Sequence, residues 1–239
     1  MKDLFGKAIL DYQTCNNPED IITETSITEE DEMNVAYLFR SYEEMPEIEK
    51  KALSLAKGRV LDIGSGAGSH SLYLQNNKKL NVTAIDISQN AIKTCQLRGL
   101  RDCRVINVLD LDNEKYDTII LLMNGTGIFG KLKNISKYLE KLKSLLNPEG
   151  QILLDSSDII YMFDEDEDGG KWISTDTDYY GELTFTIHYK GEAEEPFDWL
   201  YLDYNTLQNA AYANGLECEL ITEGEHYDYL ARLTLLKYL

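Results

Sequence analysis

The segment DIGSGAG, residues 62–68, combines a carboxylate with three glycines at alternate positions. It follows RVLDI, which is typical of a buried strand, and precedes SHSLYLQNN, which is typical of a helix. After a sharp turn at the first glycine, the two others lack a Cβ, so a ligand can lie directly on the backbone. Unpaired N–H groups at the start of the helix favour a carboxylate or phosphate. We therefore expect ligand contacts from Asp62, Gly64, Ser65, Gly66 and Gly68.

The glycine spacing differs from that of dinucleotide-binding loops. Those loops read G-x-G-x-x-G, whereas here the glycines stand at 64, 66 and 68 and position 69 is serine. Asp62 lies two residues before the first glycine, where its charge would repel a pyrophosphate. The loop therefore favours a ligand that carries positive charge and disfavours a nicotinamide-dependent oxidoreductase.

The chain around this loop alternates between strand and helix patterns. The predicted strands are RVLDI, LNVTAIDI, CRVINVLDL, YDTIILLM and QILLDS, and helical segments separate them. This alternation predicts a doubly wound, mostly parallel α/β sheet with right-handed crossovers. Two final strands, LECELITEG and YDYLARLTLLKYL, are joined by so short a turn that they must run antiparallel.

Two further parts flank this pattern. Residues 1–57 are predicted to form an N-terminal helical cap, because the apolar residues between Thr28 and Tyr42 recur at helical spacing before Pro46. Residues 58–239 form the main domain. An insertion at about 156–202 contains ELTFTIHYK and FDWLYLD, which predict a β-hairpin.

With the glycine loop placed between its strand and helix, the chain resembles the class I S-adenosylmethionine-dependent methyltransferases. Their loop reads D/E-x-G-x-G-x-G, and DIGSGAG matches every fixed position. The resemblance covers roughly Gly58 to Leu239 and is greatest to small bacterial members of unassigned substrate. It implies a Rossmann-like methyltransferase fold, S-adenosylmethionine as the methyl donor and S-adenosylhomocysteine as the product.

The resemblance also implies further cofactor residues. Asp86 would accept hydrogen bonds from the ribose hydroxyls, and Ile87 would pack on the adenine. Alternatively, Asp86 only caps the helix that starts near Gln89. Asp110 and Leu111 would reach the adenine amino group, although Asp112 is a rival and a solvated loop carboxylate is the other reading.

The end of the fourth strand, LLMNGTGIFG, completes the set of residues that the resemblance implies. Met123 and Asn124 would offer backbone oxygens to the cofactor's amino group, and the following loop, with Thr126 and Phe129, would face the substrate. The chain lacks the N-P-P-Y motif with which some members methylate amide or exocyclic amino nitrogens. This difference counts against a DNA-base or glutamine methylator.

Methyl transfer needs mainly alignment, so no catalytic side chain is obligatory. Candidate general bases are His226, in the last turn, and Asp155, at the end of the fifth strand. A surface histidine and a capping aspartate are the alternative readings. Tyr161 and Trp172 are predicted to wall a substrate pocket, although aromatic residues in an insertion often only cover a core.

The formal charge of −19 argues against nucleic-acid and anionic-membrane partners and is compatible with a small cationic or amine acceptor. The four cysteines lack metal-ligand spacing, so we expect reduced thiols, a cytoplasmic location and no metal. No secretory signal or membrane span is expected. The most probable function by these criteria is small-molecule methylation, with a non-catalytic cofactor-binding regulator as the alternative.

Overall fold

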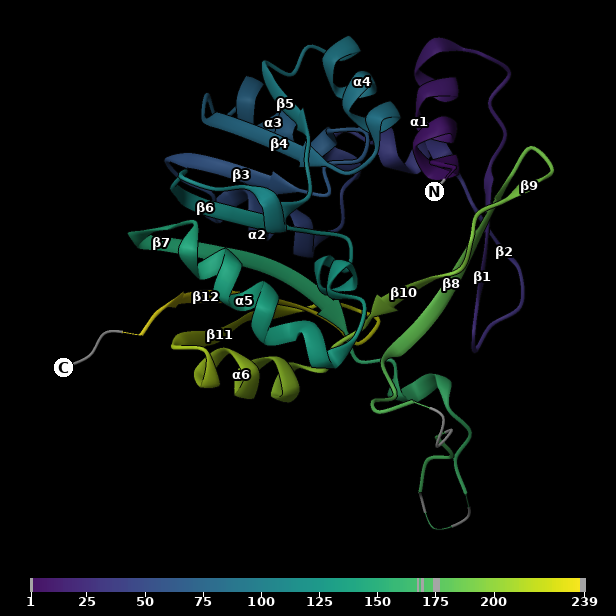
Figure 1. The fold of residues 1–239 in the computed structure, drawn as a ribbon, viewed down its shortest axis with the longest axis vertical. Helices are drawn as coiled ribbons and strands as arrows, with labels where there is room; N and C mark the ends of the chain where they lie inside the picture. Colours follow the sequence, from purple (N-terminus) through teal and green to yellow (C-terminus); the bar gives the residue numbers. More distant parts are fainter. Residues whose placement is uncertain (1, 167, 169, 174–176, 237–239) are drawn as a thin grey trace.

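The computed structural model describes residues 2–166, 168, 170–173 and 177–236, and a seven-stranded sheet forms its centre (Figure 1). The strand order is β11-β12-β7-β6-β3-β4-β5. All neighbours are parallel except β12, which runs antiparallel to β7 and to β11. The predicted mostly parallel sheet with an antiparallel last strand is confirmed. The strands are β3 (Arg59–Ile63), β4 (Asn81–Asp86), β5 (Asp102–Val105), β6 (Tyr116–Leu121), β7 (Leu146–Ser157), β11 (Leu216–Glu223) and β12 (Asp228–Leu235).

Helices cover both faces of this sheet because its central strands are apolar on both sides. Leu61 and Ile119 pack with α5 (Ile135–Ser144) and α6 (Tyr204–Ala213) on one face. Val60 and Ile120 point the other way and pack with α2 (Glu47–Leu55) and α3 (Ser69–Asn76). The helix α4 (Gln89–Leu97) lies on this second face through Cys95.

A smaller antiparallel sheet stands beside the large one (Figure 1). Its order is β10-β8-β1-β2, and β9 pairs with β8. The inserted hairpin region was predicted, but its pairing with N-terminal strands was not. The strands are β1 (Ile21–Thr25), β2 (Asp31–Met33), β8 (Glu182–Tyr189), β9 (Glu192–Ala193) and β10 (Phe197–Leu200).

The predicted helix between Thr28 and Tyr42 is wrong. The chain forms β2 there, followed by 3₁₀ turns at Val35–Phe39 and Tyr42–Glu44. Pairing of β1 with β2 satisfies backbone groups that a helix would have used. The Asn34 side chain then accepts a hydrogen bond from the Ala36 N–H and starts the first 3₁₀ turn. Tertiary pairing has therefore overridden the local helical pattern.

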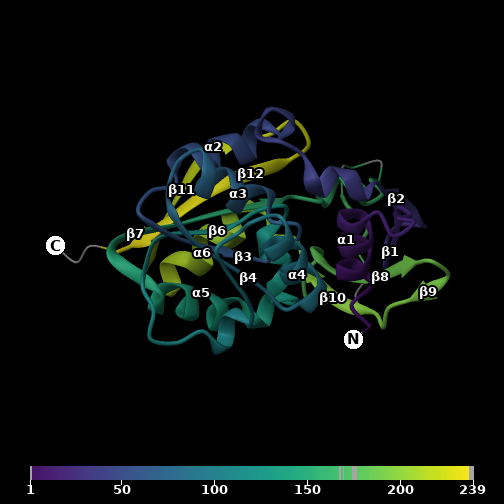
Figure 2. The ribbon, with the colours of Figure 1, turned by 90° about the horizontal axis from the view of Figure 1, so that it is seen from above.

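The first helix, α1 (Leu4–Thr14), lies between the small sheet and α4 (Figure 2). Leu4 and Ala8 pack against Ile187 and Tyr189 of β8. On the other side, a Cβ at Gly6 would come within 2.0 Å of the Ser88 hydroxyl, so only glycine allows this approach. The N-terminal segment is therefore packed against the loop that follows β4.

The turn after β9 holds the start of α1. The buried Glu194 carboxylate accepts hydrogen bonds from the backbone N–H groups of Lys2, Asp3 and Leu4, at 2.7, 3.2 and 2.9 Å. A negative charge at a helix start satisfies unpaired N–H groups and complements the helix dipole.

No helix in the described ranges combines the length and the apolar character that crossing a bilayer would require.

We predict that Glu194→Ala destabilises the protein. It leaves buried backbone donors without an acceptor, which costs about 1–3 kcal/mol. Urea unfolding should show this loss, whereas Glu195→Ala, at the exposed neighbouring position, should change the free energy of unfolding very little. Equal stabilities of the two variants would contradict the role of Glu194.

Candidate active site

The glycine loop leaves β3 with an open backbone surface. Gly64 and Gly66 have φ of 73° and 52°, in the left-handed region that favours glycine. A Cβ built on either residue meets no atom within 4 Å, so this space is free for a ligand. The N–H groups of Gly64 and Ser65 both donate to the carbonyl of Ile85, which holds the loop over the end of β4.

Gly68 has a different reason to be glycine. Its φ is 82°, but a Cβ there would lie 2.8 Å from Leu100 Cδ1 and 2.9 Å from Cys95 Sγ. Its N–H already donates to the Ser65 carbonyl at 2.7 Å. Close packing against Cys95 and Leu100 therefore requires this glycine, and its contact with a ligand stays a prediction.

Asp62 lies behind the loop and is 2% exposed. Its Oδ2 accepts a hydrogen bond from the Ser71 hydroxyl at 2.6 Å, which ties β3 to α3. Burial raises the pKa of this carboxyl, and the neighbouring His70 and the Ser71 hydrogen bond oppose the rise. The structure thus gives Asp62 a role in fixing the loop; its contact with a cofactor stays a prediction.

Asp86 connects the glycine loop to the next loop. Its two oxygens accept hydrogen bonds from the N–H groups of Gly66, at 2.9 Å, and Ser88, at 2.8 Å. Burial raises the pKa of the carboxyl, and these two hydrogen bonds oppose the rise. The side chain that caps α4 is Ser88, which accepts from the Ala91 N–H. The capping alternative for Asp86 is therefore wrong. Ile87 follows with 58% of its surface exposed, and its contact with adenine stays a prediction.

The predicted adenine contacts after β5 separate in the structure. Asp110 is exposed in a 3₁₀ turn, Val108–Asp110, whereas the Leu111 side chain is 3% exposed in the core. Asp112, the rival, forms an ion pair with Lys141 at 2.7 Å. This geometry favours Asp110 over Asp112.

The loop after β6 contains two consecutive non-glycine residues in the left-handed region. Met123 has φ of 67° and Asn124 has φ of 58°. The Asp155 carboxylate accepts hydrogen bonds from the N–H groups of Met123 and Gly125, both at 3.0 Å. Burial raises the pKa of Asp155 to about 6, although both hydrogen bonds lower it. Asp155 therefore holds the loop in a conformation that is costly on its own.

Two predicted substrate residues do not reach a substrate. Thr126 is fully buried, and its hydroxyl lies 2.7 Å from the Ser156 hydroxyl and 3.0 Å from the Leu200 carbonyl. Phe129 is 1% exposed and stacks on Tyr138. Both side chains connect the loop to the fold instead, because the 3₁₀ turn Gly125–Phe129 folds inward.

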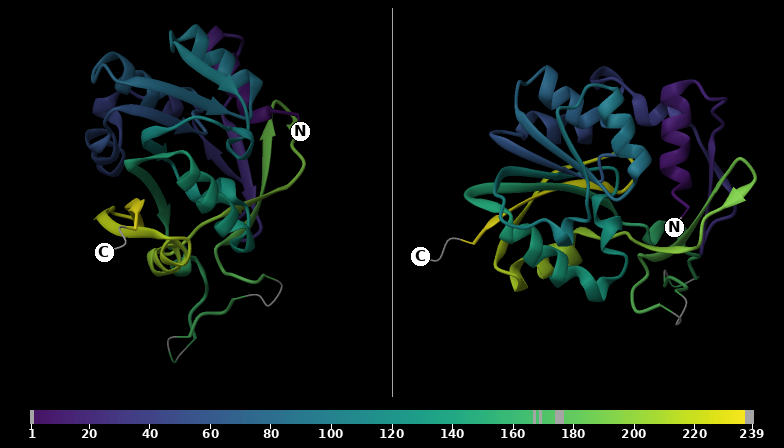
Figure 3. Two further views of the ribbon diagram at one scale, coloured as in Figure 1. Left: turned by 60° about the vertical axis from the view of Figure 1, so that its left-hand side comes forward. Right: turned by 45° about the horizontal axis from the view of Figure 1, so that its top comes forward.

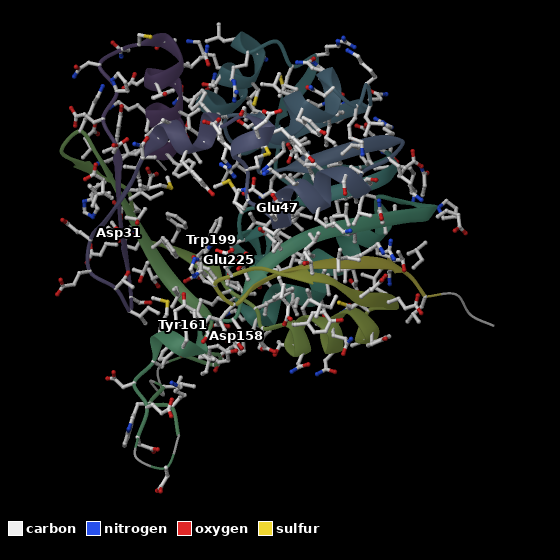
Figure 4. All side chains as sticks on the ribbon, turned by 180° about the vertical axis from the view of Figure 1, so that it is seen from behind. Asp31, Glu47, Asp158, Tyr161, Trp199 and Glu225 are labelled. Carbon is white, nitrogen blue, oxygen red and sulfur yellow. The ribbon has the colours of Figure 1, made fainter. Side chains whose placement is uncertain are left out.

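A cleft of about 1510 Å³ opens between the two sheets (Figure 4). We define its floor as Met123 and Asp155, which lie at the ends of β6 and β7. The view from behind shows Asp31 on one side, and Glu47 and Glu225 on the other. The carboxylates that line the cleft are Glu29, Glu30, Asp31, Glu47, Glu49, Asp155, Glu223, Glu225 and Asp228.

The other candidates lie at or beyond the cleft mouth. Tyr161 lines the cleft and stacks on Tyr227, with ring centroids 4.7 Å apart. His226 also lines it, in the turn between β11 and β12, where its backbone N–H donates to Asp228. Trp172 is 71% exposed and is not among the residues that line the cleft. The segment between β7 and β8 protrudes from the rest of the fold (Figure 3). The predicted place of Trp172 in a pocket wall is therefore corrected.

A buried chain of polar side chains links the glycine-loop helix to the cleft. His70 of α3 contacts the Glu49 carboxylate at 2.7 Å, and Arg40 donates to both Glu49 oxygens at 2.5 and 2.6 Å. The Arg40 guanidinium lies 4.0 Å over the Tyr37 ring. Burial pushes the pKa of Glu49 up, but His70 and Arg40 outweigh burial and hold it below its ordinary value. Sequence reasoning missed this chain, because its members come from three elements whose packing no motif encodes.

Within the described residues, no group of three or more His, Cys, Asp or Glu side chains is placed to hold a metal ion. Lys51 and His226 are the basic side chains among its lining residues.

Known proteins resemble this chain both in sequence and in structure. A family profile described as a methyltransferase domain matches residues 54–198. A crystal structure of a SAM-dependent methyltransferase from Bacteroides fragilis, in complex with S-adenosyl-L-homocysteine, is 45% identical, has a TM-score of 0.90, and aligns over 99% of this chain and 96% of that chain. No curated protein matches the sequence.

Two more distant structures share the fold alone. The CcbJ methyltransferase from Streptomyces caelestis is 16% identical, with a TM-score of 0.63 over 82% of this chain and 95% of that chain. DesVI from Streptomyces venezuelae is 14% identical, with a TM-score of 0.59 over 86% of this chain and 100% of that chain.

The two kinds of loop glycine can be separated by substitution. Gly66→Ala should cost roughly 1–2 kcal/mol from the left-handed backbone alone. Gly68→Ala carries the same backbone cost plus overpacking against Cys95 and Leu100, which adds about 1–3 kcal/mol. Urea unfolding of both variants should therefore place Gly68→Ala below Gly66→Ala. The reverse order would contradict the packing role of Gly68.

Asp155 should make stability depend on pH. Its native pKa of about 6 exceeds the ordinary 3.8, so the native state favours the protonated form. This contribution to stability is present at low pH and is lost as pH rises through 6. Asp155→Asn does not titrate. Between pH 5 and pH 7.5, the free energy of unfolding of the wild type should fall by about 1.5 kcal/mol relative to this variant. Urea titrations of both proteins at the two pH values measure the difference; a constant difference would contradict the raised pKa.

Proposed function

The chain belongs to the methyltransferase domain family of SAM-dependent enzymes, and from this premise we propose that it transfers a methyl group from S-adenosylmethionine to a small cationic or amine acceptor. The resemblance to this family is thereby confirmed. The observation that carries the proposal is the cleft, which opens at the strand ends and offers room for an acceptor. Its lining residue Met123 packs against the cluster that contains Ala67 of the glycine loop. A protein that only binds the nucleoside has no need of such a cleft.

The residues present fit the cofactor. The open backbone at Gly64 and Gly66 would take its amino-acid part, Asp86 its ribose and Ile87 its adenine. Each Asp86 oxygen uses one lone pair on a backbone N–H and keeps another for a hydroxyl. When bound, the cofactor supplies an activated methyl group on a sulfonium. The similar Bacteroides fragilis structure, with its bound S-adenosyl-L-homocysteine, supports the same choice of cofactor.

The charge of the cleft supports a cationic acceptor. Its carboxylates come from three sides: the β1–β2 turn, the start of α2 and the β11–β12 turn. Lys51 and His226 offset only a small part of this charge. A cleft lined by one sign of charge concentrates ligands of the opposite sign. Once the acceptor is held in line with the methyl group, alignment can contribute roughly 7–11 kcal/mol to catalysis.

The expected compartment is the cytoplasm. Cys15, Cys95, Cys103 and Cys218 are all unpaired in the structure. Free thiols are typical of reducing compartments, which supports this proposal.

Ligand-induced stabilisation tests the proposed cofactor. S-adenosylhomocysteine at about 100 times its Kd should raise the free energy of unfolding by roughly 2.7 kcal/mol, whereas NAD at the same concentration should not. Differential scanning calorimetry measures both. Labelled S-adenosylmethionine should then transfer its methyl group to amines in a fractionated metabolite pool, which a non-catalytic binding protein would not do.

Two matched aspartate variants test which carboxylate binds S-adenosylhomocysteine. Asp86→Asn should weaken S-adenosylhomocysteine binding by about tenfold or more, since a hydrogen bond to a charged group is worth roughly 1.5–3 kcal/mol. Asp112→Asn, which breaks only the ion pair with Lys141, should bind like the wild type. Stabilisation by NAD alone would refute the proposed function.

A further inference from the structure

Three elements bring ionisable side chains to the inner end of the cleft. Asp155 comes from the end of β7, Tyr37 from the first 3₁₀ turn, and Tyr201 from the residue after β10. All three line the cleft together with Met123. The charge of Asp155 acts on both phenols. The large sheet, the N-terminal segment and the segment after β10 therefore each contribute one group to the lining of the same cleft.

Both tyrosines are held in position while their hydroxyls stay free. The Tyr37 ring lies under Arg40, whose guanidinium also donates to the Tyr37 carbonyl at 2.6 Å. Tyr201 donates its N–H to the Gly181 carbonyl at 2.8 Å and stacks beside Phe185. Among the described residues, neither hydroxyl has a hydrogen-bond partner in the structure. Two oriented phenols without partners, in a cleft, are available to a ligand.

The protonation states of the three groups complement one another. Burial is the main cause of a raised pKa at Tyr37 and at Tyr201, so both phenols remain donors at neutral pH. Asp155, with a pKa of about 6, is ionised there. Each of its oxygens uses one lone pair on a loop N–H and keeps another. The group therefore combines one anionic acceptor with two neutral hydroxyls.

We propose that Asp155, Tyr37 and Tyr201 bind the nitrogen of a primary or secondary amine acceptor, and that Asp155 removes the proton that makes this nitrogen a nucleophile. The inference rests on the proposed function and names the atom that is methylated. A carboxylate or thiolate acceptor would be repelled by Asp155. A hydroxyl acceptor would need a much stronger base than a carboxylate.

The proposed reaction consists of a proton transfer to Asp155 followed by methyl transfer to nitrogen. The acceptor arrives as an ammonium ion and transfers one N–H proton to the Asp155 carboxylate. The freed lone pair forms the new N–C bond while the C–S bond breaks and its electron pair stays on sulfur. The product is a methylated ammonium ion, and Asp155 returns its proton to water in the cleft. The phenol oxygens accept the remaining N–H groups and orient the lone pair.

The test measures binding to the protein loaded with S-adenosylhomocysteine. The probes are two amines, tyramine and spermidine, and one anion, 4-hydroxyphenylacetate, in isothermal titration calorimetry. We expect at least one amine to bind saturably and the anion to bind at least tenfold more weakly. Tyr37→Phe and Tyr201→Phe should each weaken amine binding at least fivefold and leave S-adenosylhomocysteine affinity within twofold. Tyr212→Phe, on the exposed face of α6, is the matched control.

The outcomes separate this inference from the proposed function. Failure of S-adenosylhomocysteine to bind the folded wild type would refute the proposed function. If it binds, but neither amine binds, or the anion binds as tightly as the amines, the amine site is refuted. Unchanged amine affinity in both tyrosine variants would also refute it. With a binding amine and labelled cofactor, Asp155→Asn should lower kcat more than it raises KM.

Discussion

Buried carboxylates hold the loops at the carboxyl edge of the large sheet, and the site depends on them. These loops turn through left-handed residues, so their N–H groups find no partners in a regular helix or strand. Asp86 supplies the acceptors for Gly66 and Ser88, and Asp155 supplies them for Met123 and Gly125. In both pairs the carboxylate stands at the end of a strand beside the loop that it holds. Burial opposes ionisation at both sites, and the backbone hydrogen bonds offset part of that cost.

A second constraint joins the N-terminal segment to this edge. His70, Glu49 and Arg40 form one buried chain of polar side chains from α3 through α2 to the N-terminal segment. Burying such groups costs free energy, which close contacts must repay, and removal of one member leaves the others uncompensated. These three side chains therefore add little to the stability of the fold, but they fix the relative positions of the elements that carry them. Together they fix the position of Tyr37 relative to the helix that follows the glycine loop. The proposed cofactor and acceptor regions are therefore held in one arrangement.

The sequence alone predicted those parts that local chemistry determines. The alternation of strands and helices, the antiparallel last strand and the glycine loop were readable because each depends on neighbouring residues. The small sheet was not readable, because β1 pairs with β8 across some 160 residues and only tertiary packing brings them together. The inward turn of Thr126 and Phe129 escaped prediction for the same reason. At Gly68 the sequence indicated ligand access but not the packing against Cys95 and Leu100, since both select a residue without Cβ.

The arrangement of the large and small sheets also explains how part of the negative charge comes to line one cleft. Distributed evenly, −19 charges would only keep the protein soluble and repel other copies. The two sheets instead turn part of this charge toward one cleft, where its low-dielectric walls strengthen the field felt by a ligand. At the inner end the charge is reduced to Asp155 and Glu49, and Glu49 is neutralised by Arg40. Among the described residues, a cation that entered the cleft would therefore meet Asp155 as the one carboxylate of the floor without an ion pair, which suits the proposed removal of a proton from a single nitrogen.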